Sequence, residues 1–356
     1  MQLTRRALAA LPALAAAPAF AKTPAKRPRP LAVAHRGASG ERPEHTLMAY
    51  RLAIAEGADF IEPDLVVTKD GHLVVRHENE IGGTTDVAKH AEFAARRTAK
   101  VIDRQKIEGW FTEDFTLTEL KTLRARERLP GLRPESARHD GQEPIPTYKE
   151  MLDLARAESR RLGRTIGTYP EMKHPTSFAA IGLPLEHRLA AFLKAEGLNR
   201  RDAPVFVQCF EVGALKTFAT LSKAPRVFLV SGQGGPADQP NTTYAELLSG
   251  EGIKQVASFA DGLGPEWPMV VPVADGDLGA PTALVAEAHA AGLKVHPWTV
   301  RAENAFLPPK LRKGASPADH GDVDALYRAL WTSGVDGLFS DFTALSVKVR
   351  NELFPA

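Results

Sequence analysis

The stretch LAVAHRGASGERPEHTLMAYRLAIAEGADFIEPDLVV, residues 31–67, contains a complete strand–helix–strand unit. Apolar runs at 31–36 and 60–67 predict two strands. The segment TLMAYRLAIAEG between them has apolar residues three and four positions apart, which is typical of a helix. Similar alternation continues to the end of the chain, and about eight such units predict an α/β fold, a closed TIM (β/α)8 barrel.

The chain holds one candidate strand more than an eight-stranded barrel needs. The nine are residues 31–36, 60–67, 73–78, 165–173, 204–210, 226–230, 261–264, 294–300 and 337–342. Only residues 68–72, which contain the turn sequence TKDG, join the second to the third, and this is too short for a parallel crossover, so these two predict a hairpin. A turn centred on Asp70 and Gly71 places Asp64 opposite His77. Even a slip of one residue would leave His77 level with Glu62 and Asp64.

Residues 79 to about 146 have no barrel pattern. They mix short charged helix-like pieces with the turn-rich sequence RLPGLRPESARHDGQEPIP. We interpret them as a segment inserted after the hairpin, over one rim of a single catalytic barrel domain that spans residues 22–356.

The first 21 residues predict an export signal rather than an ordinary amphipathic helix. Arginines at 5 and 6 precede an uncharged stretch of Ala, Leu and Pro, and AFA at 19–21 fits a cleavage site. The arginine pair indicates the twin-arginine route. We therefore expect a soluble protein of the bacterial periplasm or the cell exterior, and of these two locations we predict the periplasm. No cysteine follows the signal to carry a lipid, so we expect no stable membrane anchor.

The charge balance argues against a nucleic-acid partner. The chain has 45 Lys and Arg residues, of which the predicted signal removes two, so 43 basic residues face 43 acidic ones. A neutral chain has no general field for nucleic acid or an anionic membrane surface. The single cysteine, Cys209, excludes an internal disulfide. We expect a small-molecule substrate and no obligate protein partner.

Polar residues gather where the predicted strands end, which is where barrel enzymes place their chemistry. Glu62 and Asp64 are two apart on one strand and point to the same side, and Glu171 ends another strand. Three converging carboxylates repel one another unless a hard cation such as Ca²⁺ or Mg²⁺ binds them. The alternative for each acid alone is a helix cap or an ion pair.

Two histidines and two cationic side chains complete this set. His35 and His77 are suited to act as general base and general acid near neutral pH, although a lone strand histidine is more often structural. Arg36 and Lys173 offer donors to a phosphate. A metal, two histidines and basic anchors together indicate a phosphodiester substrate.

The segments AHRGASGERPEHT, IEPDLVVTKDGHLVVRHE, YPEMKHP, VQCF, DGLGP, VHPWTVR and GLFSDF resemble the glycerophosphodiester phosphodiesterase family, especially its periplasmic bacterial members. The resemblance implies a TIM barrel with an insertion that cleaves glycerophosphodiesters to glycerol 3-phosphate and an alcohol. It implies His35 and His77 as acid and base, Glu62, Asp64 and Glu171 as metal ligands, and Arg36 and Lys173 near the phosphate. It favours calcium over magnesium.

Further residues in the matched segments are given weaker roles. We expect Glu44 to orient Arg36 or a metal ligand, with a purely structural role as the alternative. We take His45 as a helix cap or a surface residue. Phe210 and Trp298, and with them Phe342, are expected to line the glycerol side of the pocket. Pro63 lacks an N–H and predicts a missing ladder bond.

Three other functions fit parts of the pattern. A glycoside hydrolase could use Glu171 with Glu266, but it leaves the histidines, Arg36 and the Glu62–Asp64 pair without a role. A phospholipase-type barrel would act on intact lipids, for which the sequence shows no docking helix. A binding protein for phosphate esters would hold its ligand without turnover.

Overall fold

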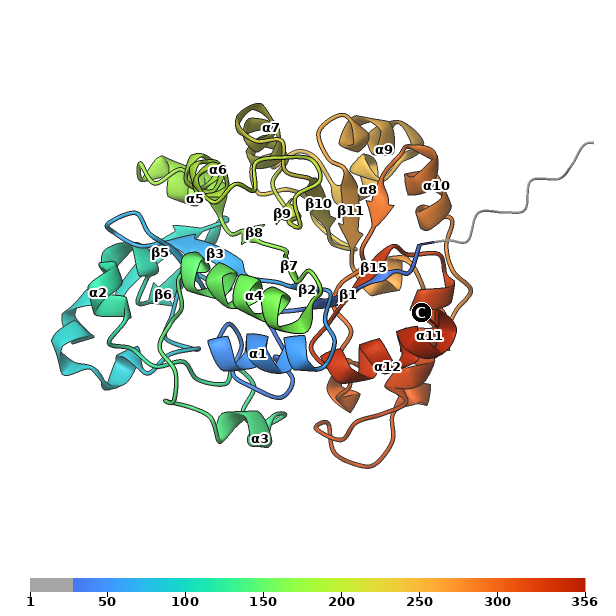
Figure 1. Ribbon diagram of the computed structural model, residues 1–356, viewed down its shortest axis with the longest axis horizontal. Helices are drawn as coiled ribbons and strands as arrows, with labels where there is room; N and C mark the ends of the chain where they lie inside the picture. The colour runs from blue at the N-terminus through green and yellow to red at the C-terminus, as the bar shows by residue number, and fades with distance from the viewer. Residues whose placement is uncertain (1–27, 356) are drawn as a thin grey trace, which may run out of the picture.

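The computed structural model describes residues 28–355, so the predicted export signal lies outside the described residues. Eight parallel barrel strands run through the centre, with helices around them (Figure 1). We call them staves, because two of them are interrupted and consist of two short strands each. In chain order the staves are β1 (Leu31–Ala34), β2 (Phe60–Ile61) continued by β3 (Asp64–Val67), β7 (Gly167–Thr168) continued by β8 (Glu171–Met172), β9 (Val207–Cys209), β10 (Arg226–Val230), β11 (Gly262–Pro265), β14 (Lys294–Val295) and β15 (Gly337–Ser340).

The staves close into a barrel. β15 pairs in parallel with β1, and on its other side Val300, beyond β14, bridges Ser340. The Phe339 N–H donates to the Pro297 carbonyl at 3.0 Å, which continues the same seam. The predicted TIM (β/α)8 barrel is therefore confirmed.

Prolines interrupt two of the staves close to the candidate site. Pro63 separates β2 from β3, and Pro170 separates β7 from β8, because proline has no N–H to give to a ladder. Pairing resumes beyond both breaks, where the Glu171 N–H donates to the Pro63 carbonyl at 2.9 Å. The breaks leave Glu62 and Glu171 beside irregular backbone.

The hairpin of β3 with β4 (Leu73–Val75) forms as expected, but the predicted register is wrong by one residue. Leu65 pairs with Val75, and the Arg76 N–H donates to the Asp64 carbonyl at 3.0 Å, so Arg76 rather than His77 lies opposite Asp64. The reason is the turn. Thr68 and His72 close a loop of three residues, with Gly71 at φ +85° in the left-handed position such a loop requires.

Helices cover the outside of the barrel. They are α1 (Leu47–Ala55), α4 (Tyr148–Leu162), α5 (Pro175–Ala180), α6 (Leu185–Ala195), α7 (Val212–Leu221), α8 (Tyr244–Leu247), α9 (Gly250–Ala257), α10 (Leu284–Ala290), α11 (Val323–Thr332) and α12 (Thr343–Leu353). Local sequence sets their ends: α4 begins at a capping box of Thr147 with Glu150 and ends at Gly163, which is left-handed. Across residues 28–355, no helix is both long and apolar enough to cross a membrane.

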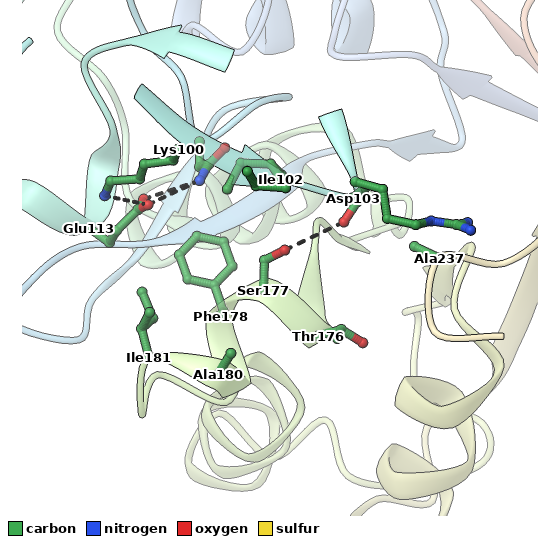
Figure 2. Close-up of a pocket in the computed structure, with 13 residues that line it drawn as sticks. Lys100, Ile102, Asp103, Glu113, Thr176, Ser177, Phe178, Ala180, Ile181 and Ala237 are labelled. Carbon is green, nitrogen blue, oxygen red and sulfur yellow. Dashed lines mark hydrogen bonds and ion pairs between the residues drawn. The ribbon is translucent and has the colours of Figure 1, made fainter. Parts of the chain in front are cut away.

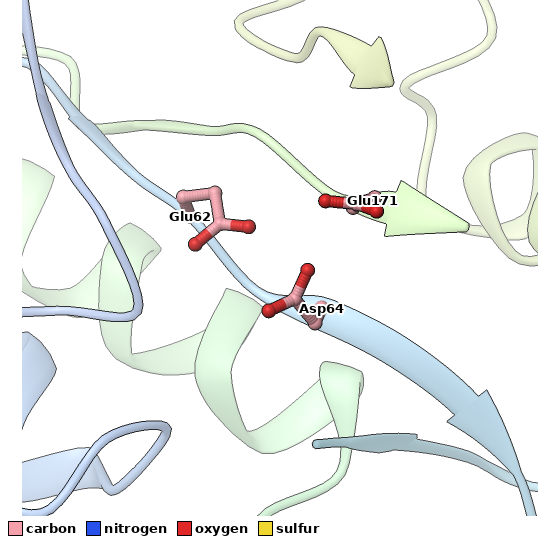
Figure 3. Close-up of side chains that lie close together, drawn as sticks. All are labelled: Glu62, Asp64 and Glu171. Carbon is pink, nitrogen blue, oxygen red and sulfur yellow. The ribbon is translucent and has the colours of Figure 1, made fainter. Parts of the chain in front are cut away.

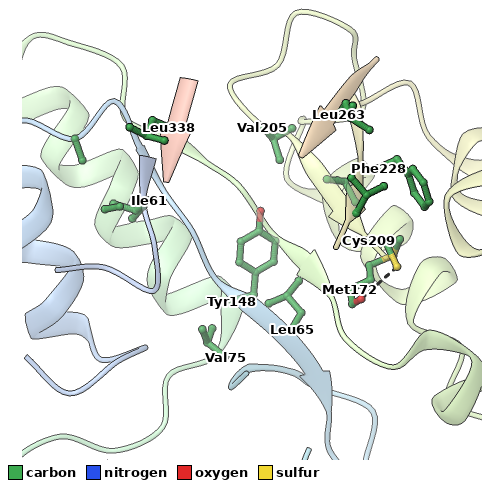
Figure 4. Close-up of a cluster of buried hydrophobic side chains, with 14 of the residues drawn as sticks. Ile61, Leu65, Val75, Tyr148, Met172, Val205, Cys209, Phe228, Leu263 and Leu338 are labelled. Carbon is green, nitrogen blue, oxygen red and sulfur yellow. Dashed lines mark hydrogen bonds between the residues drawn. The ribbon is translucent and has the colours of Figure 1, made fainter. Parts of the chain in front are cut away.

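Two apolar clusters hold the barrel together. The larger packs side chains of the staves against the helices, and Figure 4 shows part of it. The smaller lies between facing staves and includes Val33, Tyr169 and Phe339. His296 is fully buried, and its Nδ1 lies 2.7 Å from the Tyr169 hydroxyl. These side chains fill the barrel, so the chemistry has room only at its mouth.

Residues 79–146 form an irregular layer at one side of the barrel (Figure 1). It contains the hairpin of β5 (Thr98–Ile102) with β6 (Gln105–Gly109), the short helices α2 (Leu117–Leu120) and α3 (Pro134–Ala137), and three 3₁₀ turns at Val87–Lys89, Ala91–Arg96 and Thr112–Asp114. A second small hairpin, β12 (Val273–Ala274) with β13 (Asp277–Leu278), follows β11.

Candidate active site

Glu62, Asp64 and Glu171 converge at the mouth of the barrel (Figure 3). One carboxylate oxygen of each lies within 4.8 Å of one of each of the others, and the three residues are 1%, 1% and 7% exposed. Burial and the charge of Asp64 raise the pKa of Glu62 well above its usual value. Burial and repulsion from Asp64 outweigh the contact with Lys173 and raise the pKa of Glu171 to about 8. Two of the three acids therefore resist ionisation when they are close together without a cation.

The three acids fit a divalent cation. Asp64 Oδ1 is buried and has no hydrogen-bond partner, which is costly for a carboxylate oxygen unless it receives a ligand. The other oxygen, Oδ2, lies 2.9 Å from His45 Nε2. Burial alone would raise the pKa of Asp64, but His77, the bond from His45 and Lys173 hold it well below its usual value. An oxygen-only set of this kind suits Ca²⁺ or Mg²⁺ rather than zinc.

His35 follows β1 and faces this cluster. Its Nδ1 lies 2.6 Å from Asp341 Oδ1, and its Nε2 accepts from Arg36 Nε at 3.2 Å. Burial, and then the charge of Arg36, lower the pKa of His35 to about 4. Arg36 is left-handed at φ +58°, which turns the chain so that its own N–H donates to Glu62 Oε2 at 2.7 Å.

His77 has the same pattern of partners. Its Nδ1 lies 2.5 Å from Glu78 Oε1, and its Nε2 lies 3.3 Å from Lys173 Nζ. Burial, Arg36 and Lys173 lower the pKa of His77 to about 3. Both histidines are therefore neutral at pH 7, and each holds a carboxylate at Nδ1 and a cation at Nε2.

The two predicted phosphate anchors lie between the acids and the histidines. Arg36 Nη1 donates to Glu44 Oε2 at 3.2 Å, and its Nε lies 3.4 Å from Asp64 Oδ2. Lys173 Nζ donates to Glu171 Oε1 at 2.8 Å. Both side chains are at most about one tenth exposed, so their charges act in a poorly hydrated site.

A cavity of about 360 Å³ opens over these groups. It is lined by His35, Arg36, Glu62, His77, Glu171, Lys173, Gln208, Phe210, Leu229, Trp298, Thr299, Arg301 and Phe339. Phe210 and Trp298 form its aromatic wall, with ring centroids 5.6 Å apart and planes at 86°. Phe342 does not line it, since its ring packs against His320 and near Arg133. Glu266, the second acid of the glycosidase alternative, is also absent from the lining and accepts from the Gly232 N–H at 2.9 Å.

A larger hollow, about 520 Å³, lies between the β5–β6 hairpin and α5 (Figure 2). Asp103 and Ser177 approach each other across it, and Ile102 and Phe178 supply apolar lining. None of the predicted site residues lines this larger cavity, so cavity size alone would not locate the predicted active site.

The structure corrects the role expected for His45 and adds residues that the sequence did not single out. His45 is neither cap nor surface: it is fully buried, at φ +59°, and joins the Tyr50 hydroxyl at 2.8 Å to Asp64. Thr46 caps α1 instead. Asp341 and Glu78 hold the histidines, and Gln208 Nε2 donates to Glu62 Oε1 at 3.3 Å. In the sequence, only the position of His45 directly before the helix cap Thr46 could have indicated its role.

A (β/α)8 barrel that gathers buried acids, two histidines and two cations at one mouth defines a class, the barrel hydrolases of phosphate esters. The model of the glycerophosphoryl diester phosphodiesterase family matches residues 35–345. The chain belongs to this family, as its sequence motifs predicted.

Relatives agree with this assignment. The chain is 37% identical to a glycerophosphodiester phosphodiesterase of Arabidopsis thaliana, over 88% of this chain and 84% of the relative. It is 29% identical to a glycerophosphodiester phosphodiesterase of Haemophilus influenzae, over 89% of each chain.

Solved structures share the fold. One is a putative glycerophosphoryl diester phosphodiesterase of Silicibacter pomeroyi, with a TM-score of 0.67, 22% identity and coverage of 92% of this chain and 95% of that one. Another is a phosphodiesterase of Oleispira antarctica in complex with the product sn-glycerol-3-phosphate, with a TM-score of 0.58, 21% identity and coverage of 90% and 96%.

Proposed function

We propose that the protein hydrolyses glycerophosphodiesters to glycerol 3-phosphate and an alcohol, with a divalent cation and the pair His35 and His77 as general acid and base. The observation that carries the proposal is the buried carboxylate cluster directly beside two histidines, each with Nε2 toward a cationic side chain. The names of the relatives support the substrate class, as does the glycerol 3-phosphate bound to the Oleispira phosphodiesterase.

Glu62, Asp64 and Glu171 would hold the cation, for which we propose calcium over magnesium. The ion supplies charge neutralisation at a phosphate oxygen when bound. Lys173 Nζ lies between Glu171 and His77, where it can donate to an oxygen of the same phosphate. Arg36, whose Nε lies 3.4 Å from Asp64 Oδ2, contributes a second positively charged side chain.

The histidines exchange protons at Nε2, because Nδ1 of each is occupied by a carboxylate. Their lowered pKa leaves both neutral in the free protein, so either can accept a proton from the nucleophile at once. A phosphate anion beside the second histidine favours its protonated form, which then protonates the leaving alkoxide. The nucleophile is water or the substrate's own glycerol hydroxyl, and the second route passes through a cyclic phosphate.

The remaining assignments complete the proposal. Phe210 and Trp298 form the glycerol side of the cavity, and Glu44 orients Arg36 through its 3.2 Å contact. The catalytic domain spans residues 22–356, with the insertion at about 79–146. The segment 1–21 directs export to the periplasm.

Product analysis tests the proposal. Phosphorus NMR of glycerophosphocholine incubated with the protein and Ca²⁺ or Mg²⁺ should show glycerol 3-phosphate, with a transient cyclic phosphate if the substrate hydroxyl attacks. Folded protein that binds the diester without turnover would contradict it in favour of a binding protein. Release of reducing sugar without any divalent ion, or cleavage of intact phospholipids alone, would contradict it in favour of the other two alternatives.

A further inference from the structure

Two arginines of the insertion reach the mouth of the barrel. They lie at the ends of residues 128–133, which we call the arginine strap. The strap is a tight turn, because the N–H groups of Leu132 and Arg133 both donate to the Leu129 carbonyl at 2.9 Å. Glu127 secures its start by accepting from the Leu129 N–H at 2.8 Å. The two guanidinium groups are thus held in a fixed relation to each other.

Arg128 joins two carboxylates on one side of the mouth. It binds Glu78 through Nη1–Oε1 at 3.0 Å and Nη2–Oε2 at 2.6 Å. It also binds Glu44 through Nε–Oε2 at 2.8 Å and Nη2–Oε1 at 2.7 Å. Glu78 is the Nδ1 partner of His77, and Glu44 contacts Arg36.

Arg133 does the same on the other side. Its Nη2 donates to Asp341 Oδ2 at 2.6 Å, its Nε to Glu303 Oε1 at 2.5 Å, and its Nη1 to the Ser39 carbonyl at 2.9 Å. Asp341 is the Nδ1 partner of His35. The side chain of Arg133 is only 5% exposed, so this pair lies in a poorly hydrated environment.

The two arrangements are similar although they share no barrel strand, with the difference that Asp341 also accepts from Arg301 Nε at 2.9 Å. In each, a strap arginine binds a carboxylate, that carboxylate holds Nδ1 of a histidine, and Nε2 of the histidine faces the cavity. A carboxylate that stays ionised can only accept a hydrogen bond, so it requires the hydrogen of a neutral imidazole to sit on Nδ1. Burial raises the pKa of each acid, but His77 and Arg128 outweigh it at Glu78, and Arg301, Arg133 and His35 outweigh it at Asp341, so both acids stay ionised.

We propose that the insertion completes the active site: Arg128 and Arg133 are positioning residues that fix both histidines in the tautomer with the hydrogen on Nδ1, which leaves Nε2 unprotonated. The inference rests on the proposed function for the roles of His35 and His77. The inference gives the insertion a role in the reaction, because one short segment determines which ring nitrogen of His35 and of His77 can accept a proton. The arginines themselves do not touch the substrate.

The test uses Arg128→Ala and the conservative Arg133→Lys, because removal of the Arg133 side chain would leave the buried Glu303 without its arginine partner. Arg96→Ala is the matched control. Arg96 belongs to the same insertion and binds Glu119 through Nη1–Oε2 at 3.0 Å and Nη2–Oε1 at 2.5 Å, away from the mouth. We expect kcat to fall about 10- to 100-fold in both strap variants, with KM and metal affinity within about twofold. Arg96→Ala should keep the wild-type kcat.

Two further readouts separate positioning from general stability. Added guanidinium ion, at concentrations that leave the protein folded, should raise kcat of Arg128→Ala but not of Arg96→Ala. Nitrogen-15 NMR of labelled histidine should show His77 in the Nδ1–H form in the wild type and a mixture of tautomers in Arg128→Ala. The NMR result does not depend on activity, so an inactive wild type would refute the proposed function and still leave the strap tested.

Three results would overturn the inference. The first is kcat within about twofold of wild type in both folded strap variants. The second is an unchanged tautomer of His77 in Arg128→Ala. The third is a loss of activity that follows a lower melting temperature, with no response to guanidinium.

Discussion

Metal affinity should depend strongly on pH through Glu171. Its carboxyl has a pKa of about 8 in the free site and must lose its proton before its oxygen can bind a cation. A single group with this pKa is about half ionised at pH 8 and about one hundredth ionised at pH 6, so the association constant falls roughly 50-fold as the pH is lowered. Glu62, whose pKa is also raised, adds to the fall.

Calorimetric titration with Ca²⁺ or Mg²⁺ at pH 6, 7 and 8 measures this effect. Repeating it in buffers with different ionisation enthalpies gives the protons released, which should be about one per ion at pH 7. Glu171→Gln should bind more weakly at pH 8 and respond less to pH, because the titrating group is gone. An association constant that changes less than about threefold between pH 6 and 8, with no proton released, would refute the reasoning.

Three substitutions probe other parts of the molecule. His35→Ala and His77→Ala should each lower kcat by about 10² or more while metal affinity is kept, and kcat within a few-fold of wild type would exclude an acid/base role. His45→Ala should weaken metal binding about 10- to 100-fold in a calorimetric titration, because Asp64 loses the bond that orients it, and unchanged affinity would make His45 a packing residue only. Gly71→Ala, at φ +85°, should cost about 1 kcal/mol in denaturant unfolding and leave kcat unchanged, and equal stability would mean that the turn relaxes.

The sequence predicted those features that depend on local pattern. Alternating strands and helices predicted the barrel, and the two-residue spacing of Glu62 and Asp64 predicted a shared direction for their side chains. The hairpin register was wrong because a three-residue loop and a two-residue turn are both compatible with TKDG. This one-residue difference in register places Arg76 rather than His77 opposite Asp64.

Contacts between distant segments could not be predicted in this way. His35 meets Asp341 across 306 positions, and Arg133 meets Asp341 across 208. The insertion has no periodic pattern to show which of its arginines point to the barrel. His45 was misplaced because a cap residue and a residue turned inward by a left-handed backbone look alike beside Thr46.

Release of glycerol 3-phosphate from glycerophosphocholine, by protein first treated with a chelator and then supplied with Ca²⁺ or Mg²⁺, tests the central claim most directly. The claim is that Glu62, Asp64 and Glu171 hold a cation that the cleavage requires. We predict no release after chelation and recovery with one of the two ions, with Ca²⁺ the more effective. Release that continues unchanged after chelation, or no release with either ion from folded protein, would contradict the claim.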